Sequence, residues 1–547
     1  MKAFAALYAQ LDATTSSNAK LLAMQNYFVA APAEDAAWAV FFLAGGKPRQ
    51  LVPSKVLRAY GTQAAGIPDW LFEESYHSVG DLAETLSLLL PPGEQSDDMG
   101  LAQWMQERLL PLRGLPPEEI MARLDAYFNV LETRERFVLG KLVTGSLRVG
   151  VSKLLVTRAL AQVSNLDAKL IAQRMMGYTD LSARPDSRAF ARLIDASLDA
   201  DADRVDGRPY PFFLAHPLQI PTSDFEAKLG APQHWLVEWK WDGIRAQLVR
   251  RGGRTWLWSR GEELITERFP ELSAMGNVLG DGLVLDGEIL VWEKEQVQSF
   301  ARLQLRLGRK TVGPKILSEQ PVVFLAYDLL EFDGTDCRHM PQEERRARLE
   351  SVCAGAQHPA LRLSPQVSGQ TWEALDAIRD EARERGVEGM MLKARTAGYG
   401  VGRTKNEGVW WKWKVDPFSI DAVLLYAQRG SGRRASLYSD YTFAVWDAPE
   451  GVTDRKLVPI AKAYSGLTDA EMRRVDAIVR RSTIEKFGPV RSVTPSQVFE
   501  LGFEGIARSS RHKSGVALRF PRMLRWREDK KIQEADTLGT LMDMLPP

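Results

Sequence analysis

The chain has 547 residues, 45% of them hydrophobic and 26% charged, a globular composition that predicts roughly three or four domains. The 71 basic and 70 acidic residues give a net charge of +1, which argues against a protein that simply coats nucleic acid but allows a local basic groove. No run of eighteen apolar residues indicates a membrane span. Two cysteines, Cys337 and Cys353, exclude a disulfide framework and a four-cysteine zinc site, and are typical of a reducing, cytoplasmic setting.

Residues 1–205 are predicted to form an all-α domain, because apolar residues recur every three or four positions in segments such as 80–90 and 116–143. Part of this domain is basic and contains the sequence TGSLRVGVSK (144–153). Its two glycines and small hydroxyl residues would let backbone N–H groups approach phosphates. A solvated helix face with a tight turn explains the same composition, and both interpretations stay open. The cations of this segment are Arg134, Arg136, Lys141, Arg148, Lys153 and Arg158.

Acidic and proline-containing residues at 201–213 indicate a linker, after which residues 206–416 are predicted to form an α+β domain built on antiparallel sheets. Short segments rich in Val, Leu and aromatic residues predict strands at 235–241, 244–251, 254–259, 283–292 and 322–330. Helices are expected at 343–354 and 371–385.

A second boundary is expected near 415–421, so that residues 417–547 form a third domain. Five strands are predicted there, at 420–428, 435–447, 456–464, 498–507 and 516–526, with one helix at 471–487. Five strands with an inserted helix indicate a small β-barrel of the OB-fold type.

Lys240 is an unusual lysine, since it lies between Trp239 and Trp241 and precedes Asp242 and Gly243. A lysine acts as a nucleophile only when its amine is uncharged, and apolar surroundings or neighbouring cations favour that state. The Asp–Gly pair predicts a tight turn that would hold the amine at the mouth of a sheet. KxDG by itself is a weak motif, and plain sheet packing is a competing explanation for the two tryptophans.

Four further segments carry acids or bases suited to phosphoryl transfer. LDGEILVW (285–292) and VEGMMLK (387–393) supply carboxylates, whereas WWKWK (410–414) and RFPRMLRWREDK (519–530) supply cations. Lys412 and Lys414 are two positions apart, so they are expected on one face of a strand. Two lysines there are favourable only opposite a strong anion such as a triphosphate. Met390 and Met391 are interpreted as sheet core.

In this order, the segments resemble those of the ATP-dependent DNA ligases within the covalent nucleotidyltransferase superfamily. KWDGIR, SRG (259–261), LDGEI, LAYDLLEFDG (325–334), VEGMMLK, WWKWK and RFPRMLRWREDK match the family motifs over roughly residues 208–535. The N-terminal half is similar to the DNA-binding domain of the larger three-domain ligases, and the chain looks most like the bacterial members. The resemblance implies that Lys240 is adenylylated, that Glu238 reads the adenine amino group, and that Tyr327 stacks on the base.

The resemblance also implies roles at the phosphates. Arg245 and Arg260 should lie near the ribose and phosphates, with Glu288 on the ribose or a metal. Glu388 should be a metal ligand. The remaining implied residues are Lys393, Lys412 and Lys414 at the α-phosphate, Arg527, Asp529 and Lys530 at the departing pyrophosphate, and Lys141, Arg148, Lys153, Arg302 and Arg306 at DNA.

The resemblance also implies that the protein is a monomer that encircles nicked duplex DNA as a clamp. It implies a cytoplasmic location at the bacterial nucleoid and no membrane partner. It would use ATP and Mg²⁺, with Mn²⁺ as a substitute. A hinge is expected near Asp416 and Pro417, so that the C-terminal cations leave before DNA binds.

Five other functions are less consistent with the sequence. NAD-dependent ligases carry a four-cysteine zinc element, which two cysteines cannot supply. RNA ligases and capping guanylyltransferases share the lysine motif but normally lack some 200 helical residues in front of it. A non-catalytic DNA scaffold is disfavoured by the intact acids and lysines, and a P-loop ATPase by the lack of GxxxxGK[ST].

Overall fold

The computed structural model describes residues 1–91, 98–180, 184–197, 207–307, 309, 312–404, 409–430 and 436–545. The predicted boundary between residues 205 and 206 therefore lies outside the described residues. The chain divides into two compact units, of which the first comprises Met1–Leu51, Asp98–Arg113 and Gly145–Val415 and the second comprises Val52–Asp97, Gly114–Thr144 and Asp416–Pro547. Among the described residues, no helix is both long and apolar enough to cross a membrane.

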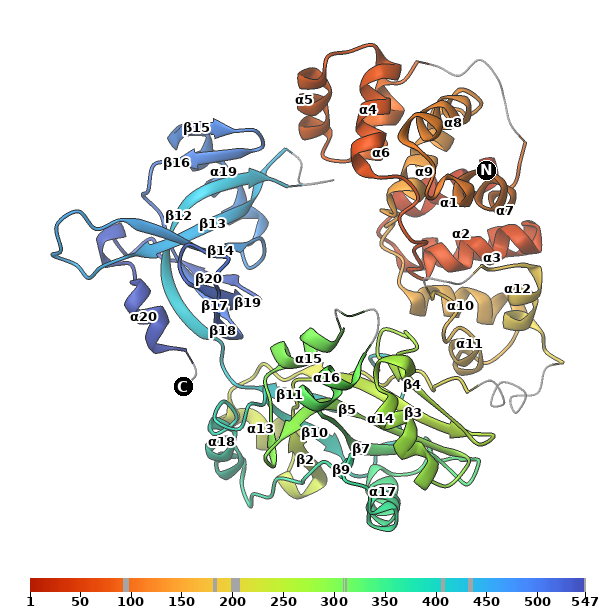
Figure 1. Cartoon of the computed structure of the whole chain (residues 1–547), viewed down its shortest axis with the longest axis vertical. Helices are drawn as coiled ribbons and strands as arrows, with labels where there is room; N and C mark the ends of the chain where they lie inside the picture. Colours follow the sequence, from red (N-terminus) through yellow and green to blue (C-terminus); the bar gives the residue numbers. More distant parts are fainter. Residues whose placement is uncertain are drawn as a thin grey trace. The chain divides into compact units, whose positions relative to one another are not determined.

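The N-terminal part is helical throughout, as the apolar periodicity predicted (Figure 1). In the first unit, Phe4, Trp38 and Leu160 are buried where these helices pack together. Serine or aspartate side chains cap several of the helices, including Ser152 before α10 and Asp167 before α11. The α-helices in the N-terminal part of this unit are α1 (Lys2–Asp12), α2 (Ser17–Ala30), α3 (Ala33–Leu43), α7 (Leu101–Gln103), α10 (Lys153–Ser164), α11 (Ala168–Arg174) and α12 (Ser187–Ile194).

In the second unit, the segment predicted to be helical at 116–143 contains two helices. Residues 116–143 form two helices rather than one continuous run, separated by residues 130–132. Gly140 in the later helix lies so close to Ala83 that a Cβ atom would come within 2.7 Å of the Ala83 Cβ, so a glycine is needed there. The helices are α4 (Ser54–Ala65), α5 (Asp69–Val79), α6 (Leu82–Leu89), α8 (Pro117–Asn129) and α9 (Thr133–Thr144).

Residues 207–415 form two sheets with helices around them, drawn from yellow-green to teal in Figure 1. The smaller sheet has the order β1 (His216–Pro217), β11 (Trp410–Lys414), β10 (Gly389–Ala394) and β2 (Trp235–Trp239). The larger sheet has the order β4 (Arg254–Ser259), β3 (Ile244–Arg251), β5 (Leu283–Glu293), β7 (Val322–Phe332) and β8 (Thr335–Asp336), with β6 (Gln296–Val297) on β5 and β9 (Leu361–Leu363) on β7.

The strands predicted from sequence are present, but the sheets are mixed rather than purely antiparallel. The short strands β1 and β9 pair in parallel with β11 and β7, where two-residue and three-residue strands carried too little pattern to be predicted. The helices of this region are α13 (Phe225–Leu229), α14 (Pro270–Met275), α15 (Phe300–Leu307), α16 (Pro314–Glu319), α17 (Gln342–Ala356) and α18 (Trp372–Asp380).

Residues 418–545 form a strand-rich domain in which the longest strand pairs along both edges. β12 (Phe418–Arg429) pairs with β13 (Tyr438–Trp446) on one side and with β16 (Val490–Val493) and β17 (Val498–Phe503) on the other. β13 continues to β14 (Leu457–Ala463), and β17 continues to β20 (Arg522–Trp526). The Met523 N–H donates to the Ser465 carbonyl at 3.0 Å, which brings the open edges together as the OB-fold prediction requires.

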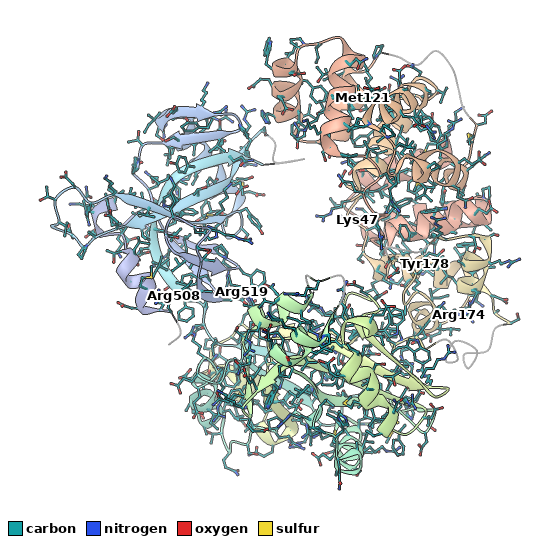
Figure 2. The ribbon with its side chains drawn as sticks, viewed as in Figure 1. Lys47, Met121, Arg174, Tyr178, Arg508 and Arg519 are labelled. Carbon is teal, nitrogen blue, oxygen red and sulfur yellow. The ribbon has the colours of Figure 1, made fainter. Side chains whose placement is uncertain are left out.

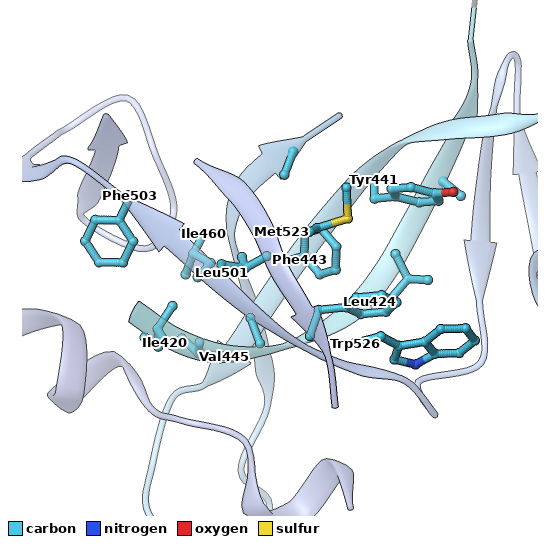
Figure 3. Packing of buried hydrophobic residues seen from close by; sticks show 14 of the residues in the cluster. Ile420, Leu424, Tyr441, Phe443, Val445, Ile460, Leu501, Phe503, Met523 and Trp526 are labelled. Atoms are coloured by element: carbon cyan, nitrogen blue, oxygen red, sulfur yellow. The ribbon is translucent and has the colours of Figure 1, made fainter. Parts of the chain in front are cut away.

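The inside of this curled sheet is filled by alternate residues of the strands. Figure 3 shows Leu424, Phe443, Leu501 and Trp526 packed together, and all four are buried. The predicted helix at 471–487 is too long, because α19 (Asp469–Ser482) ends where β-branched residues begin β15 (Thr483–Phe487). The remaining elements are β18 (Gly505–Arg508), β19 (Val516–Arg519) and α20 (Leu538–Asp543).

Candidate active site

Lys240 follows the last residue of β2 and is held there by the neighbouring strand. Its N–H donates to the Gly389 carbonyl and its carbonyl accepts from the Glu388 N–H, both at 2.8 Å. The side chain is about a fifth exposed, and its Nζ lies 2.5 Å from Glu388 Oε2. The turn that follows requires Gly243, where a Cβ atom would lie 2.4 Å from the Ile289 carbonyl oxygen. The backbone thus presents the amine at the rim of the smaller sheet.

The two tryptophans beside Lys240 are packing residues. Trp239 lies on the opposite face of β2 and joins a hydrophobic cluster with Trp372, Met390 and Trp413. Trp241 is partly buried and donates its indole N–H to Ser364 Oγ at 3.2 Å. Sheet packing, the competing explanation from the sequence, therefore accounts for both rings.

Three lysines meet at this edge of the smaller sheet. β10 and β11 pair Gly389 with Lys414 and Met391 with Lys412, which places both β11 lysines on the same face. Lys414 Nζ is 3.3 Å from Glu388 Oε2, the oxygen that also contacts Lys240. Burial and the nearby charges of Lys414 and Lys240 lower the pKa of Lys412. Three cations gathered near one carboxylate, two of them in contact with it, leave an excess of positive charge that suits a polyphosphate.

Two carboxylates near Lys240 differ in charge state. Burial raises the pKa of Glu388, but its ion pairs with Lys240 and Lys414 outweigh burial and lower that pKa below its usual value. Glu288 is buried, and desolvation raises its pKa to about 7 although Lys240 and Arg245 favour its charged form. Glu288 accepts a hydrogen bond from the Gly243 N–H at 3.2 Å. It therefore lies directly beneath the turn that follows the lysine.

Arg245, expected near the ribose and phosphates, is engaged inside the protein. Its Nε and Nη2 donate to the two oxygens of Asp286 at 3.1 and 2.7 Å, and its Nη1 donates to the Phe213 carbonyl at 2.7 Å. The Tyr399 hydroxyl donates to Asp286 at 2.6 Å. Sequence reasoning assigned no role to Asp286 or Tyr399, because no local pattern connects residues so far apart in the chain. The cluster braces β3 against β5, and this is how the structure positions Arg245.

Glu238 lies on the same face of β2 as Lys240 and is almost fully buried. One oxygen accepts from Arg346 at 2.8 Å and the other lies 2.5 Å from Lys393 Nζ. Arg346 comes from α17 and was missed by sequence reasoning, because a helix arginine carries no signal of its partner.

Lys393, implied at the α-phosphate by the resemblance, is a buried lysine with partners inside the protein. Its side chain is 2% exposed, donates to the Tyr327 carbonyl at 3.1 Å, and lies 4.5 Å from the centre of the Tyr327 ring. A lysine buried in this way supports the tyrosine and neutralises Glu238, and the register of β10 with β11 places it on the same face of the sheet as Lys412 and Lys414.

Arg260 lies in the turn after β4, and its side chain is exposed. Its N–H donates to the Arg245 carbonyl at 3.0 Å, so the turn is held beside the first residues of β3. The structure thus brings Glu238, Lys240, Arg245, Glu288, Tyr327, Glu388, Lys393, Lys412 and Lys414 to one site, with Arg260 at its margin.

The five cations expected at DNA fall into different environments. Arg148 is exposed, whereas Lys141 is buried and bonded to Asp81. Lys153 is bonded to Glu262, and Arg302 donates to Glu293 at 2.6 Å.

Arg306 is the clearest correction among these cations. It is fully buried and donates to both oxygens of Glu271 at 2.6 Å and to the carbonyls of Arg268 and Gln320. With its donors satisfied inside the fold, Arg306 serves packing. Lys141 is corrected in the same sense by its burial against Asp81, and neither is carried into the DNA-binding proposal.

The C-terminal residues expected at pyrophosphate converge on one aspartate. Arg527 Nη1 and Lys530 Nζ lie 2.9 and 2.5 Å from Asp421 Oδ2, and Arg527 also pairs with Asp529 at 2.8 Å. The hydrogen bond from Arg527 lowers the pKa of Asp529 to about 2. Asp421, on β12, was missed because it lies over a hundred residues before its partners.

No group of three or more His, Cys, Asp or Glu side chains in the described part of the chain is arranged to hold a metal ion. Mg²⁺ in phosphoryl-transfer sites is commonly held by one or two carboxylates together with substrate phosphates and water. Glu288 and Glu388 match that smaller donor set. The raised pKa of Glu288 marks a buried carboxylate that an added cation would stabilise in its charged form.

A lysine at the end of β2, one carboxylate with a lowered and one with a raised pKa, and a pair of lysines on β11 of the same sheet define the site of a covalent nucleotidyltransferase. Family models agree. The DNA ligase N terminus matches residues 1–161, the ATP dependent DNA ligase domain matches 213–414, and the ATP dependent DNA ligase C terminal region matches 434–530. The chain belongs to the ATP-dependent DNA ligase family, and its activity is the ATP-dependent sealing of nicks in duplex DNA.

Individual proteins show the same relationship along the whole chain. A "Probable DNA ligase" of Koribacter versatilis (strain Ellin345) is 31% identical over 96% of this chain and 93% of its own length. A "DNA ligase" of Thermococcus onnurineus (strain NA1) is 26% identical over 98% of this chain and 96% of its own length. A solved structure described as "Pmar-Lig_Pre." covers 96% of this chain and 99% of its own with a TM-score of 0.63 and 16% identity, which supports the fold.

Proposed function

We propose that this ligase acts through a lysyl–AMP intermediate at Lys240. The observation that carries the proposal is the pairing of two lysines with Glu388, with Lys240 Nζ 2.5 Å and Lys414 Nζ 3.3 Å from the same oxygen, and Lys412 beside them on the same strand face. A polyphosphate that enters this cluster offers the lysines several phosphate oxygens in place of one carboxylate. The uncharged amine of Lys240 is the attacking group, and Lys412 and Lys414 bind the phosphate oxygens.

In the first step the Lys240 amine attacks the α-phosphate of ATP in line. An N–P bond forms, the bond from the α-phosphorus to the bridging oxygen breaks, and pyrophosphate leaves. Lys412 and Lys414 stabilise the charge that develops on the α-phosphate oxygens. The Tyr327 ring and Glu238 are proposed to bind the adenine, with Lys393 supporting both from beneath. Arg527 and Lys530 orient the departing pyrophosphate.

In the second step the 5′-phosphate at a DNA nick attacks the lysyl phosphorus, and AMP moves to the DNA with cleavage of the N–P bond. In the third step the 3′-hydroxyl attacks the activated 5′-phosphate, and AMP leaves as the new phosphodiester forms. Covalent storage on Lys240 separates ATP use from DNA sealing, so activation is kept until a nick is bound.

Glu288 and Glu388 are the residues proposed to hold Mg²⁺, with Mn²⁺ as a substitute. The ion would supply Lewis acidity and charge screening at the phosphates. Glu288 also remains available to a ribose hydroxyl through its position beside the Gly243 N–H.

Nicked duplex DNA is the substrate, and we propose that a monomer encircles it in the cytoplasm, beside the nucleoid. The proposed domains are the helical DNA-binding domain at 1–205, the adenylation domain at 206–416 and the OB-fold domain at 417–547. Arg148 and Arg302 remain the proposed side-chain contacts to DNA, of which Arg148 is exposed, and Lys153 is proposed to serve DNA binding through its ion pair with Glu262.

The experiment that tests the proposal incubates the protein with Mg²⁺ and α-labelled ATP, GTP or adenylate-labelled NAD, and then adds nicked duplex DNA. We expect a covalent protein label from ATP alone, lost to free AMP as the nick is sealed. Label from GTP only, or a label that persists when nicked DNA is supplied, would contradict the proposed function.

Substitution of the nucleophile gives a sharper test. Lys240→Ala should form no covalent adduct with ATP, yet should still seal a nick that is already adenylylated to some degree, because the third step does not use the lysine as nucleophile. Lys412→Ala, which keeps Lys240, is the matched variant and should slow the adduct without abolishing it. An adduct formed by Lys240→Ala would overturn the assignment.

A further inference from the structure

The turn that carries Arg260 is closed by its own hydrogen bonds. The Glu262 N–H donates to the Ser259 carbonyl at 2.8 Å, and the Ser259 N–H donates to the Glu263 carbonyl at 2.9 Å. The Glu263 N–H also reaches Ser259 Oγ at 3.2 Å. Residues 259–263, called the SRG turn below, therefore move as one piece, and Arg260 moves with them.

Glu262 adopts a backbone conformation that costs energy. Its φ of +64° lies in the left-handed region, where a residue with a Cβ atom is disfavoured by about 1–2 kcal/mol relative to the right-handed one. Such residues persist where their surroundings hold them, and they are concentrated at functional sites. Glu262 is held by its side chain, whose Oε2 contacts Lys153 Nζ and accepts from the Gly177 N–H at 3.4 Å.

Lys153 is equally constrained on the helical side of this contact. It is the first residue of α10, whose N-cap Ser152 accepts from the Leu155 N–H, and its Nζ donates to the Met175 carbonyl at 3.0 Å. A cation in the first turn of a helix opposes the helix dipole. Burial lowers the pKa of Lys153, while Glu262 favours its charged form. Only a fixed anionic partner makes a lysine favourable at this position.

The chain before Lys153 is anchored as well. Lys20 of α2 is buried and donates to the carbonyls of Val149 and Gly150, the latter at 3.2 Å. Because these carbonyls turn inward to Lys20, the start of α10 is held to α2 immediately before the contact with Glu262. Lys153 is therefore held in place by the helical region, and through Glu262 it holds the SRG turn in place.

We propose that Lys153 and Glu262 are positioning residues that hold the SRG turn, and Arg260 with it, for the steps in which nicked DNA is bound. This deepens the proposed function and rests on it. Lys153 was expected at DNA from its place in the basic segment, but its Nζ contacts Glu262 and Met175. Its contribution to DNA binding is to place Arg260.

The proposal distinguishes between reaction steps. Neither Lys153 nor Glu262 contacts the Lys240, Lys412 and Lys414 cluster, so formation of lysyl–AMP from ATP does not depend on their ion pair. The resemblance implies Arg260 near the ribose and phosphates of the nucleotide. Its side chain is exposed at the margin of the site, joined to β3 through its N–H bond to the Arg245 carbonyl, and its proposed partner is a DNA strand instead. Loss of the pair should slow nick sealing and spare adduct formation.

The test measures the two steps separately on the full chain. Adduct formation is followed with α-labelled ATP without DNA, and sealing is followed in single turnovers from purified enzyme–adenylate and nicked duplex. Lys153→Met and Glu262→Gln should each slow sealing about tenfold or more, because each leaves the other member of the ion pair without its charged partner. Adduct formation should change less than about twofold in both variants. Lys153→Arg keeps the charge and should retain most of the sealing rate.

Two more variants separate positioning from folding. Glu262→Gly relieves the left-handed strain and removes the carboxylate, so it should fold at least as well as Glu262→Gln and yet seal as slowly. Arg58→Met breaks an ion pair with Glu73 between α4 and α5, within the other compact unit, and should leave both steps unchanged.

The outcomes are decisive in either direction. Equal slowing of both steps by Lys153→Met and Glu262→Gln, or normal sealing by Glu262→Gly, would overturn the positioning role. Failure of the wild-type chain to form the adduct or to seal the nick would instead be a failure of the proposed function, and is seen before any variant is compared.

Discussion

Glu288 and Glu388 show how two glutamates near one lysine acquire opposite properties. Both lose solvent, which disfavours the charged form of each. Glu388 has two lysine partners within 3.3 Å, whereas Glu288 is more deeply desolvated, accepts from the Gly243 N–H, and is beside the negative charge of Asp286. Glu388 is therefore ionised at neutral pH, and Glu288 is poised to gain or lose a proton. Nothing in the sequence distinguishes the two residues, since the difference arises from partners in other strands.

The raised pKa of Glu288 predicts a pH-dependent stability. The folded chain keeps the proton up to pH 7, while the unfolded chain loses it near its ordinary value of 4.5, so the unfolded state binds fewer protons between these limits. Stability should therefore fall as pH rises from 4.5 to 7, by about 3 kcal/mol in total from this group. Glu288→Gln cannot ionise and should lose this contribution.

The measurement is the thermal unfolding midpoint of wild type and Glu288→Gln at several pH values between 4.5 and 8, without nucleotide and with a chelator. The variant should gain relative to wild type as pH rises. Glu293→Gln, at an exposed carboxylate paired with Arg302, is a suitable control and should show no such gain. Parallel curves for wild type and Glu288→Gln would contradict the assignment of the titrating group.

At the scale of strands and helices, the patterns that repeat within one element were predictable. The two-residue period placed Lys412 and Lys414 on one face, and the same period sends Trp239 to the other side of β2 from Lys240. Partners between elements were not predictable, as the ion pair of Glu238 with Arg346 and the burial of Lys393 show. Arg306 illustrates the same limit, because an amphipathic helix pattern does not reveal which cation turns inward.

The C-terminal barrel leads to a prediction about its cation cluster. Asp421 on β12 holds both Arg527 and Lys530, which presents them as a preformed pair at the end of β20. Arg527→Ala and Lys530→Ala should lower the rate of lysyl–AMP formation by about a hundredfold, as expected for the loss of a charge-stabilising donor, and should impair the final sealing step less. Both rates are measured with labelled ATP and with pre-adenylylated nicks.

Arg525→Ala is the matched control for this cluster. Arg525 lies on the same strand, is exposed, and pairs with Glu500 at 3.3 Å, so its loss should change adduct formation by less than about twofold. Similar losses in adduct formation and sealing for Arg527→Ala would remove its pyrophosphate-orienting role. The hairpin formed by β18 and β19 carries Arg508 and Arg519, which are labelled in Figure 2. None of these substitutions changes that hairpin.

For the molecule as a whole, the order of domains and motifs followed from sequence, because each motif combines residue types that are rarely found together by chance. The net charge of +1 said nothing about where cations gather. The structure shows that many of these cations form ion pairs inside the protein, as Lys141 does with Asp81 and Arg245 does with Asp286. The cations left for DNA are therefore fewer than the sequence suggested, and each should have a measurable effect on binding.

Binding of nicked duplex DNA should accordingly weaken steeply with salt, since a nearly neutral chain must bind phosphates through local cations. Arg148 is exposed in the turn that Lys20 anchors, so Arg148→Gln should reduce the slope of log Kd against log salt by about one and weaken binding to all sequences alike. Arg385→Gln is the control, because Arg385 lies over the Trp239 ring on the face of β2 that points away from Lys240. An unchanged slope for Arg148→Gln, or an equal change for Arg385→Gln, would place the DNA phosphates elsewhere on the chain.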